Sequence, residues 1–98
     1  MARQINVKGY VAGSPVVINL EAVDPPLTIT LIPGAGNTSR CEYSTTPGAA
    51  GDPGTAAWIA WPGDVVSTPT TDVVVGPVSA LRFTRVSGSS QDSYEVLA

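Results

Sequence analysis

The sequence predicts an all-β protein, folded as a single antiparallel β-sandwich over residues 1–98, with seven to eight short strands and essentially no helix. The first argument is spacing: the chain has ten glycines and nine prolines, and no interval free of both exceeds ten residues. A typical helix needs about 11–12 residues, whereas a strand needs about five or six. The second argument is alternation, because apolar side chains recur at every second position between the turns. Immunoglobulin-like and jelly-roll-like sandwiches both fit this pattern.

The first half of the chain contains four strand candidates separated by turn residues. They are residues 4–10, 16–20, 27–32 and 39–46. The third candidate, Leu-Thr-Ile-Thr-Leu-Ile, alternates most regularly, with leucine and isoleucine inward and threonine outward. Because only the short loop 33–37 separates the third and fourth candidates, we expect them to pair as an antiparallel hairpin.

The second half begins with the Pro/Gly/Ala-rich segment 46–55, which predicts a long protruding loop. The stretch 56–63 follows and holds both tryptophans. The remaining strand candidates are residues 65–66, 71–75, 78–86 and 94–97. Residues 87–91 are polar and predict another hairpin loop. We expect Met1–Val7 and Tyr94–Ala98 to lie at sheet edges, where unpaired backbone groups can meet another chain.

Alternation also predicts the core. The residues expected to be buried are Ile5, Val7, Val16, Ile18, Leu27, Ile29, Leu31, Tyr43, Val74, Leu81, Phe83 and Val96. Cys41, the single cysteine, cannot form an internal disulfide and is expected to be a small buried apolar residue. A lone cysteine fits synthesis in a reducing cytoplasm.

The charge distribution excludes several classes of partner. Charged residues make up 13% of the chain and the net charge is −3. The five basic residues are scattered, so we expect no nucleic-acid partner. No apolar run approaches the ~20 residues of a membrane span, and the first residues lack the apolar centre of a signal peptide. We therefore expect no membrane partner either.

Residues that could perform catalysis are missing or isolated. The chain has no histidine, which removes the commonest general base and metal ligand, and leaves Cys41 without an activating partner. The acids do not form a calcium-binding loop, and a carboxylate pair of Asp64 and Asp72 is a remote alternative to two turn formers. The loop 33–37 lacks the Lys-Ser/Thr of a phosphate-binding loop. We expect no enzyme activity, cofactor or metal.

Trp58 and Trp61 are the residues with the greatest potential to bind a partner. Three residues apart in an extended segment, they would face opposite ways, so that one packs in the core and the other is free to anchor a partner or stack on a sugar ring. The alternative is that both tryptophans serve only in core and loop packing. With them, the candidate partner-contact residues are Trp58, Trp61, Asp52, Arg3 and Ile5. A carbohydrate-binding module, in which Tyr94 or Tyr10 completes a stacking site, is the alternative of a different class.

Three segments in order, Tyr43–Thr46, Trp58–Gly63 and Val75–Arg85, resemble small β-sandwich virion proteins of tailed bacteriophages. The resemblance implies a non-enzymatic virion protein made in the host cytoplasm. Its expected role is that of a capsid decoration (cement) protein on the outer surface of the head, or alternatively a tail or fibre component. The implied partner is the major capsid protein or another virion protein, and the implied state is a homo-oligomer or a multi-copy array. No catalytic residues follow from it.

Overall fold

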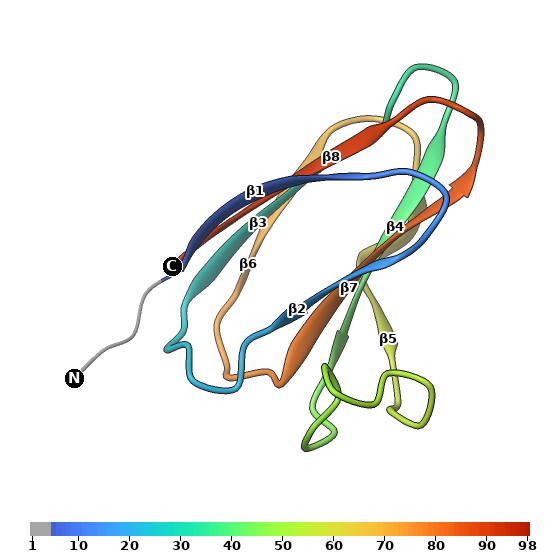
Figure 1. Cartoon of the computed structure of the whole chain (residues 1–98). Coiled ribbons are helices and arrows are strands. Elements are labelled where there is room, and N and C mark those ends of the chain that lie inside the picture. Colours follow the sequence, from blue (N-terminus) through green and yellow to red (C-terminus); the bar gives the residue numbers. More distant parts are fainter. Residues whose placement is uncertain (1–4) are drawn as a thin grey trace.

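The structure, a computed structural model, describes residues 5–98, and of residues 61–64 it describes the backbone alone. Residues 5–98 form eight strands and no helix, so the all-β prediction is confirmed. The strands lie in two antiparallel sheets stacked face to face (Figure 1). They are β1 (Asn6–Val11), β2 (Val16–Asn19), β3 (Leu27–Ile32), β4 (Thr38–Ser44), β5 (Ile59–Val66), β6 (Thr70–Val74), β7 (Ala80–Ser87) and β8 (Asp92–Leu97).

The strand order is that of a jelly roll. One sheet runs β1-β8-β3-β6 and the other β2-β7-β4-β5. Within residues 5–98, every connection except β4–β5 crosses from one sheet to the other. Two four-stranded sheets wound in this way form a jelly roll, whereas a constant-type immunoglobulin sandwich divides its seven strands four and three.

Two of the expected hairpins are wrong. β3 and β4 lie in different sheets, and so do β7 and β8. β3 pairs instead with β6 and β8, so that Ile29 lies opposite Asp72 on one side and Val96 on the other. Alternation reports which face of a strand is buried, but not which strand lies beside it. A short loop alone therefore does not distinguish a hairpin turn from an arch between sheets.

The short candidate 65–66 is not a separate segment, because β5 continues from Ile59 through Pro62 and Gly63 to Val66. The strand accommodates them by bulging: Cys41 pairs with Trp61 but Ser39 pairs with Val66, so β5 carries extra residues between the two pairs. β5 is an edge strand, and a proline is tolerated at an edge or a bulge because no ladder hydrogen bond is needed there.

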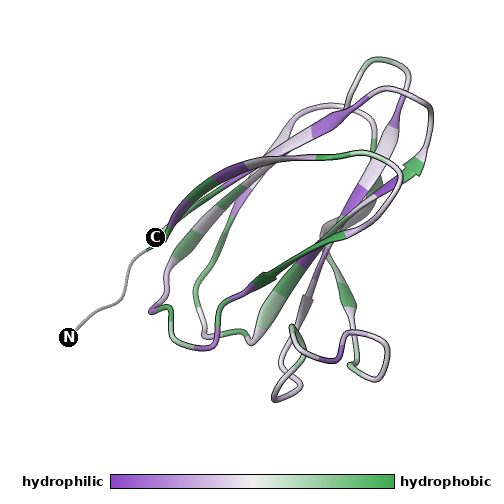
Figure 2. Ribbon diagram, in the orientation of Figure 1, coloured by the Kyte–Doolittle hydropathy of each residue, from purple (hydrophilic) through white to green (hydrophobic). Residues whose placement is uncertain are grey.

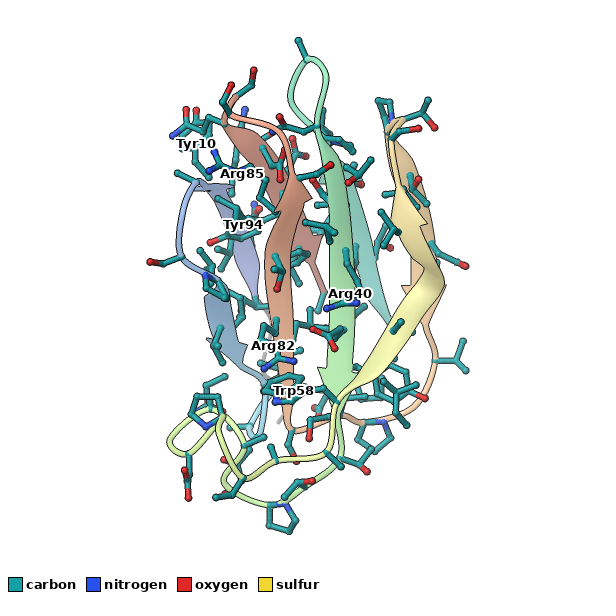
Figure 3. All side chains as sticks on the ribbon, turned by 90° about the vertical axis from the view of Figure 1, so that its right-hand side faces the viewer. Tyr10, Arg40, Trp58, Arg82, Arg85 and Tyr94 are labelled. Atoms are coloured by element: carbon teal, nitrogen blue, oxygen red, sulfur yellow. The ribbon has the colours of Figure 1, made fainter. Side chains whose placement is uncertain are left out.

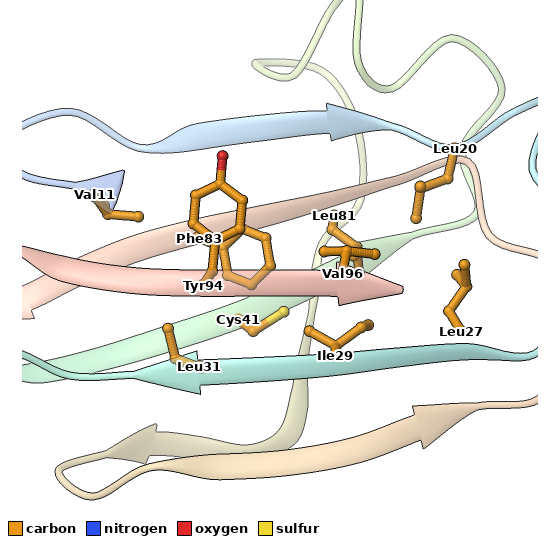
Figure 4. Close-up of a cluster of buried hydrophobic side chains, with 10 residues drawn as sticks. All are labelled: Val11, Leu20, Leu27, Ile29, Leu31, Cys41, Leu81, Phe83, Tyr94 and Val96. Atoms are coloured by element: carbon orange, nitrogen blue, oxygen red, sulfur yellow. The ribbon is translucent and has the colours of Figure 1, made fainter. Parts of the chain in front are cut away.

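The predicted core is confirmed. All of the residues expected from alternation lie in the buried cluster or pack against it. Those that are fully buried are Leu27, Ile29, Leu31, Leu81, Phe83 and Val96, and four further members of the cluster are Val11, Leu20, Cys41 and Tyr94. Figure 4 shows these side chains between the sheets, and Figure 2 shows hydrophobic residues distributed along strands of both sheets.

A stacked aromatic pair joins the two sheets at the centre of this cluster. Tyr94 of β8 stacks on Phe83 of β7, with ring centroids 4.3 Å apart and ring planes 11° from parallel (Figure 4). Gly9 lies opposite Tyr94 in the β1–β8 pairing, and a Cβ at Gly9 would collide with the tyrosine ring. The glycine thus leaves room for the ring, and only 5% of Tyr94 is exposed.

The expectation that both chain ends lie at sheet edges is correct for the N-terminal strand and wrong for the C-terminal strand. β1 is the edge strand of its sheet, but β8, which includes most of Tyr94–Ala98, lies between β1 and β3. The Ala98 N–H donates to the Ile5 carbonyl at 2.8 Å, which ties the C-terminal end to the start of β1. Of Met1–Val7, residues 1–4 lie outside the described residues.

The edge strand β6 carries its own block against pairing with another chain. Asp72 occupies a position that faces the sandwich interior by alternation, yet its side chain is exposed and accepts the Val73 N–H at 2.7 Å. A charge on an edge strand discourages edge-to-edge association. Here the carboxylate also occupies a backbone donor that an added strand could use.

We therefore expect Asp72→Val to self-associate, because it removes the charge, frees the Val73 N–H and adds a β-branched residue to an exposed edge. Sedimentation velocity over a range of protein concentrations would detect the dimers and larger species. Asp52→Val makes the same chemical change in an exposed loop and is the matched control. It should keep the association state of the wild-type protein. Equal association of the two variants would contradict the role given to Asp72.

Candidate functional site

Three connections gather at one end of the sandwich, the lower end in Figure 1. They are residues 20–26, between β2 and β3, 45–58, between β4 and β5, and 75–79, between β6 and β7. They meet because successive strands run in opposite directions, so alternate connections fall at the same end. We call this the loop end.

The 45–58 loop is folded on itself. Ala49 N–H donates to the Thr46 carbonyl at 3.1 Å, and the N–H groups of Gly51 and Asp52 donate to the Gly48 carbonyl at 3.0 and 3.1 Å. The Thr46 hydroxyl accepts the Ala57 N–H at 3.1 Å and so closes the loop across its base. Ala49 is buried, although the loop residues are mostly of intermediate hydropathy (Figure 2). Compact loops of this length pack on their own side chains and are frequently functional.

Trp58 holds this loop against the outer face of the β2-β7-β4-β5 sheet. The Arg82 guanidinium lies over the Trp58 ring, 4.5 Å from its centroid (Figure 3). The same guanidinium contacts Glu42 Oε1, from Nε at 3.0 Å and from an Nη at 2.9 Å. Trp58 Nε1–H donates to the Pro53 carbonyl at 3.0 Å. The half-buried indole therefore joins the loop to an ion pair on the sheet.

Trp58 accordingly serves first as an anchor for the chain's own loop, with one ring face occupied by Arg82. It precedes β5, so the expected alternation between the two tryptophans does not apply to it. The side chain of Trp61 lies outside the described part of the structure. The sequence could not reveal the contact between Trp58 and Arg82, because Trp58 lies in the β4–β5 loop and Arg82 lies on β7, far along the chain.

We expect Trp58→Ala to release the 45–58 loop without unfolding the sandwich, at a cost of about 1–3 kcal/mol, because the cation–π contact and the Nε1 hydrogen bond are lost together. Hydrogen exchange should then accelerate at Gly51, Asp52 and Ala57, while the β3 and β8 amides keep their protection. Trp58→Phe retains an aromatic ring over Arg82 and should show a smaller effect. Unchanged exchange within the loop would contradict the anchoring role.

Beside the loop base the surface is hollowed by two adjoining depressions, which share Thr45, Pro77 and Val78. One has a volume of about 330 Å³ and is lined by Tyr43, Thr45 and residues 73–78. The other has a volume of about 250 Å³ and is lined by Glu21, Thr45, Pro47, Pro77, Val78 and Ser79. We call the two together the loop-end groove.

The lining of the loop-end groove combines apolar walls with a few polar groups. Its walls are valine, proline and a tyrosine, with the hydroxyls of Thr45 and Ser79 and the carboxylate of Glu21 as polar groups. Among the residues that the structure describes, no lysine, arginine or cysteine lines it. Within the described residues, no cluster of histidine, cysteine or acidic side chains could hold a metal ion. Cys41 is buried in the core, where burial and the nearby Glu42 charge raise the pKa of the thiol well above its usual range.

The groove lies beside exposed apolar side chains. Val75, which lines it, is 81% exposed, and Ile59, opposite Tyr43 at the start of β5, is 55% exposed. Val73 and Val65, on the edge strands β6 and β5, are also exposed. Exposed apolar side chains therefore lie along both edge strands on this side of the sandwich, β5 and β6.

The other predicted contact residues are dispersed. Asp52 is exposed in the 45–58 loop, close along the chain to Trp58. Ile5 is partly buried and packs against the core, and Arg3 lies outside the described residues. Of the two tyrosines considered for sugar stacking, Tyr94 is buried beneath Phe83 and Gly9, whereas Tyr10 is 58% exposed on β1.

A buried polar network, which the sequence did not single out, lies at the opposite end of the sandwich. Asp92 is fully buried, and its Oδ1 accepts the Gly34 N–H and the Asn37 side-chain amide, each at 2.7 Å. Its Oδ2 accepts the Ser39 hydroxyl. Asn37 also donates to the Ser90 carbonyl at 2.7 Å, so the network joins the β3–β4 and β7–β8 connections. An aspartate beginning a strand after a polar loop carries no sequence signal of burial.

No family model, curated protein or solved structure matches this chain. Within residues 5–98, no helix is long and apolar enough to cross a membrane.

Proposed function

We propose that this chain is a non-enzymatic structural protein of a virion, a decoration protein that binds the outer surface of a phage head through surface contacts. One observation carries the proposal. Each of the three segments that resemble small virion proteins, Tyr43–Thr46, Trp58–Gly63 and Val75–Arg85, has one end at the loop end. They supply Tyr43, Thr45 and residues 75–79 to the groove lining, and they supply both members of the Trp58–Arg82 contact. The segments that carry the resemblance to virion proteins therefore all contribute residues to the surface of the loop end.

The chemistry of the surface supports a role in contact rather than reaction. A groove of valine, proline and hydroxyl groups can exclude water from an apolar partner. Among the described residues its lining includes no histidine, lysine or cysteine, and no cluster of histidine, cysteine or acidic side chains could hold a metal ion. Exposed apolar side chains beside the groove favour a surface that a partner covers. A jelly roll alone would not carry the proposal, since unrelated functions use the same fold.

A tail or fibre component would use the same surface and differs only in where the chain sits on the particle. A carbohydrate-binding module has less support, because Tyr94 is buried and one face of Trp58 is occupied by Arg82. Tyr10 remains an exposed aromatic ring, but no groove-lining residue comes from β1.

The experiment is quantitative mass spectrometry of particles purified from the host that makes this chain, combined with immunogold labelling. The expected result is that the chain co-purifies with heads at a copy number comparable to that of the major capsid protein, and that gold labels the head surface. Label confined to tails would replace the decoration role with the tail or fibre role. Absence of the chain from purified particles would overturn the proposal.

A further inference from the structure

We infer that the loop-end groove binds an extended segment of a partner protein, in which apolar side chains are flanked by lysine or arginine. This binding site would give the proposed function a partner surface of defined chemistry. It rests on the proposed function only for the claim that the segment belongs to a virion protein. The groove offers an apolar lining, and exposed acidic side chains surround it.

The apolar requirement comes from the lining. The larger depression is enclosed by Tyr43, Val74, Pro77 and Val78, and its volume of about 330 Å³ lies at the small end of the range for binding sites. The first two of these side chains come from different sheets, so the groove enters the sandwich between β4 and β6. A space of this size admits one large or two small apolar side chains. Val75, at its rim, offers further apolar area.

The basic requirement comes from the acids that surround the groove. Glu21 lines it, Asp24 is exposed in the neighbouring 20–26 connection, and Asp72 is exposed on β6 directly before the lining residues 73–78. Asp52 adds a fourth exposed carboxylate in the 45–58 loop. A concave surface bordered by one sign of charge concentrates ligands of the opposite sign.

The described basic side chains do not neutralise these acids. Arg82 and Arg40 both lie within ion-pair distance of Glu42, at 2.9 and 3.7 Å. Arg85 donates to the Ser90 carbonyl at the opposite end of the sandwich. Lys8 lies opposite Glu95 on the outer face of the other sheet. The loop-end groove therefore remains acidic.

This charge pattern favours a different protein over a second copy of the chain. Two copies meeting through their loop-end grooves would bring Glu21, Asp24 and Asp72 of each toward those of the other, and like charges placed together disfavour association. A segment with basic residues on either side of an apolar centre would form ion pairs with the acids and place its apolar side chains against the groove lining. We expect an extended segment, because one wall of the groove is the continuous stretch 73–78, which begins in the edge strand β6.

The test uses two blocked peptides, acetyl-Lys-Leu-Val-Leu-Lys-amide and acetyl-Glu-Leu-Val-Leu-Glu-amide, titrated into the ¹⁵N-labelled protein and followed by amide chemical shifts. The lysine peptide should shift the amides of Thr45 and of the lining residues 73–79, and should bind about fivefold more tightly than the glutamate peptide at low salt, since each exposed ion pair contributes a fraction of a kcal/mol. Added salt should reduce that difference.

Two variants and a control separate the contributions. Glu21→Lys should remove most of the preference for the lysine peptide, and Val75→Asp, at a side chain too exposed to matter for folding, should weaken the apolar contact. Glu95→Lys makes the same charge change on the outer face of β8 and should bind like the wild type. Equal affinity for the two peptides, shifts centred elsewhere, or a dimer formed through the groove would overturn the inference.

The outcome is independent of the particle experiment. Peptide binding at the groove by a chain absent from virions would retain the inference and remove the virion role. A chain present on heads that binds neither peptide, and whose Glu21→Lys and Val75→Asp variants occupy heads at full copy number, would retain the virion role and remove the inference.

Discussion

Replacing Phe83 with alanine is expected to lower the free energy of unfolding by about 3–5 kcal/mol, the range for removing a buried aromatic ring. Phe83 is fully buried between the sheets, and its ring stacks on Tyr94 with centroids 4.3 Å apart. The substitution removes the stacking contact and leaves a cavity between β7 and β8, which are each held in place by paired strands in their own sheet and cannot easily close it. Equilibrium urea denaturation followed by tryptophan fluorescence and by far-ultraviolet circular dichroism would measure the loss.

Val86→Ala is the matched control, because Val86 lies on the same strand with its side chain exposed. It should change stability by no more than about 0.5 kcal/mol. Phe83→Leu should lie between the two and remains measurable if the alanine variant is too unstable to fold. A Phe83→Ala loss as small as that of the control would mean that the aromatic pair is not central to the core.

Replacing Asp92 with alanine is expected to cost about 3 kcal/mol or more. The carboxylate is the acceptor for the Gly34 N–H, the Asn37 amide and the Ser39 hydroxyl, and these donors would lose their partner in a buried site. An unsatisfied buried polar group costs about 1–3 kcal/mol, and the cost is higher where the lost partner was charged. Urea denaturation measures the total, and exchange of the Gly34 amide reports the local loss.

Asp92→Asn distinguishes hydrogen bonding from packing. The amide keeps the size and one acceptor oxygen, but its NH₂ group faces a donor in place of the second oxygen, so a loss smaller than that of alanine is expected. Asp24→Ala removes an exposed carboxylate and should leave stability almost unchanged. If Asp92→Ala and Asp24→Ala cost the same, the buried network does not hold the β3–β4 and β7–β8 connections together.

The sequence was sufficient for the core and insufficient for the pairing of strands. Leu27, Ile29 and Leu31 are buried because alternation in a strand is a local property, set by the two-residue period of the backbone. The partner of a strand is not local. β3 pairs with β6 and β8, which lie far along the chain, and no feature of the 33–37 loop indicates that it arches to the other sheet.

The candidate site was predicted in part. The segment 46–55 could be recognised as a long loop of small residues ahead of a tryptophan, and the observed 45–58 loop that contains it does lie at the groove. The ion pair beneath Trp58 and the acids bordering the groove could not be recognised, because they come from strands and loops that only the folded chain brings together. Asp92 shows the same limit, since a polar residue in a polar stretch gives no sign of burial.

The central claim is that this chain acts by contact through the loop-end groove. The most direct measurement is a cryo-electron microscopy map of purified particles that carry the chain. The account predicts that Val75 and the residues 73–79 face the neighbouring protein, and that a segment of that protein with apolar and basic side chains lies in the groove. A map in which the groove is open to solvent, and the contact runs through the outer face of the β1-β8-β3-β6 sheet or through the end that holds Asp92, would contradict it.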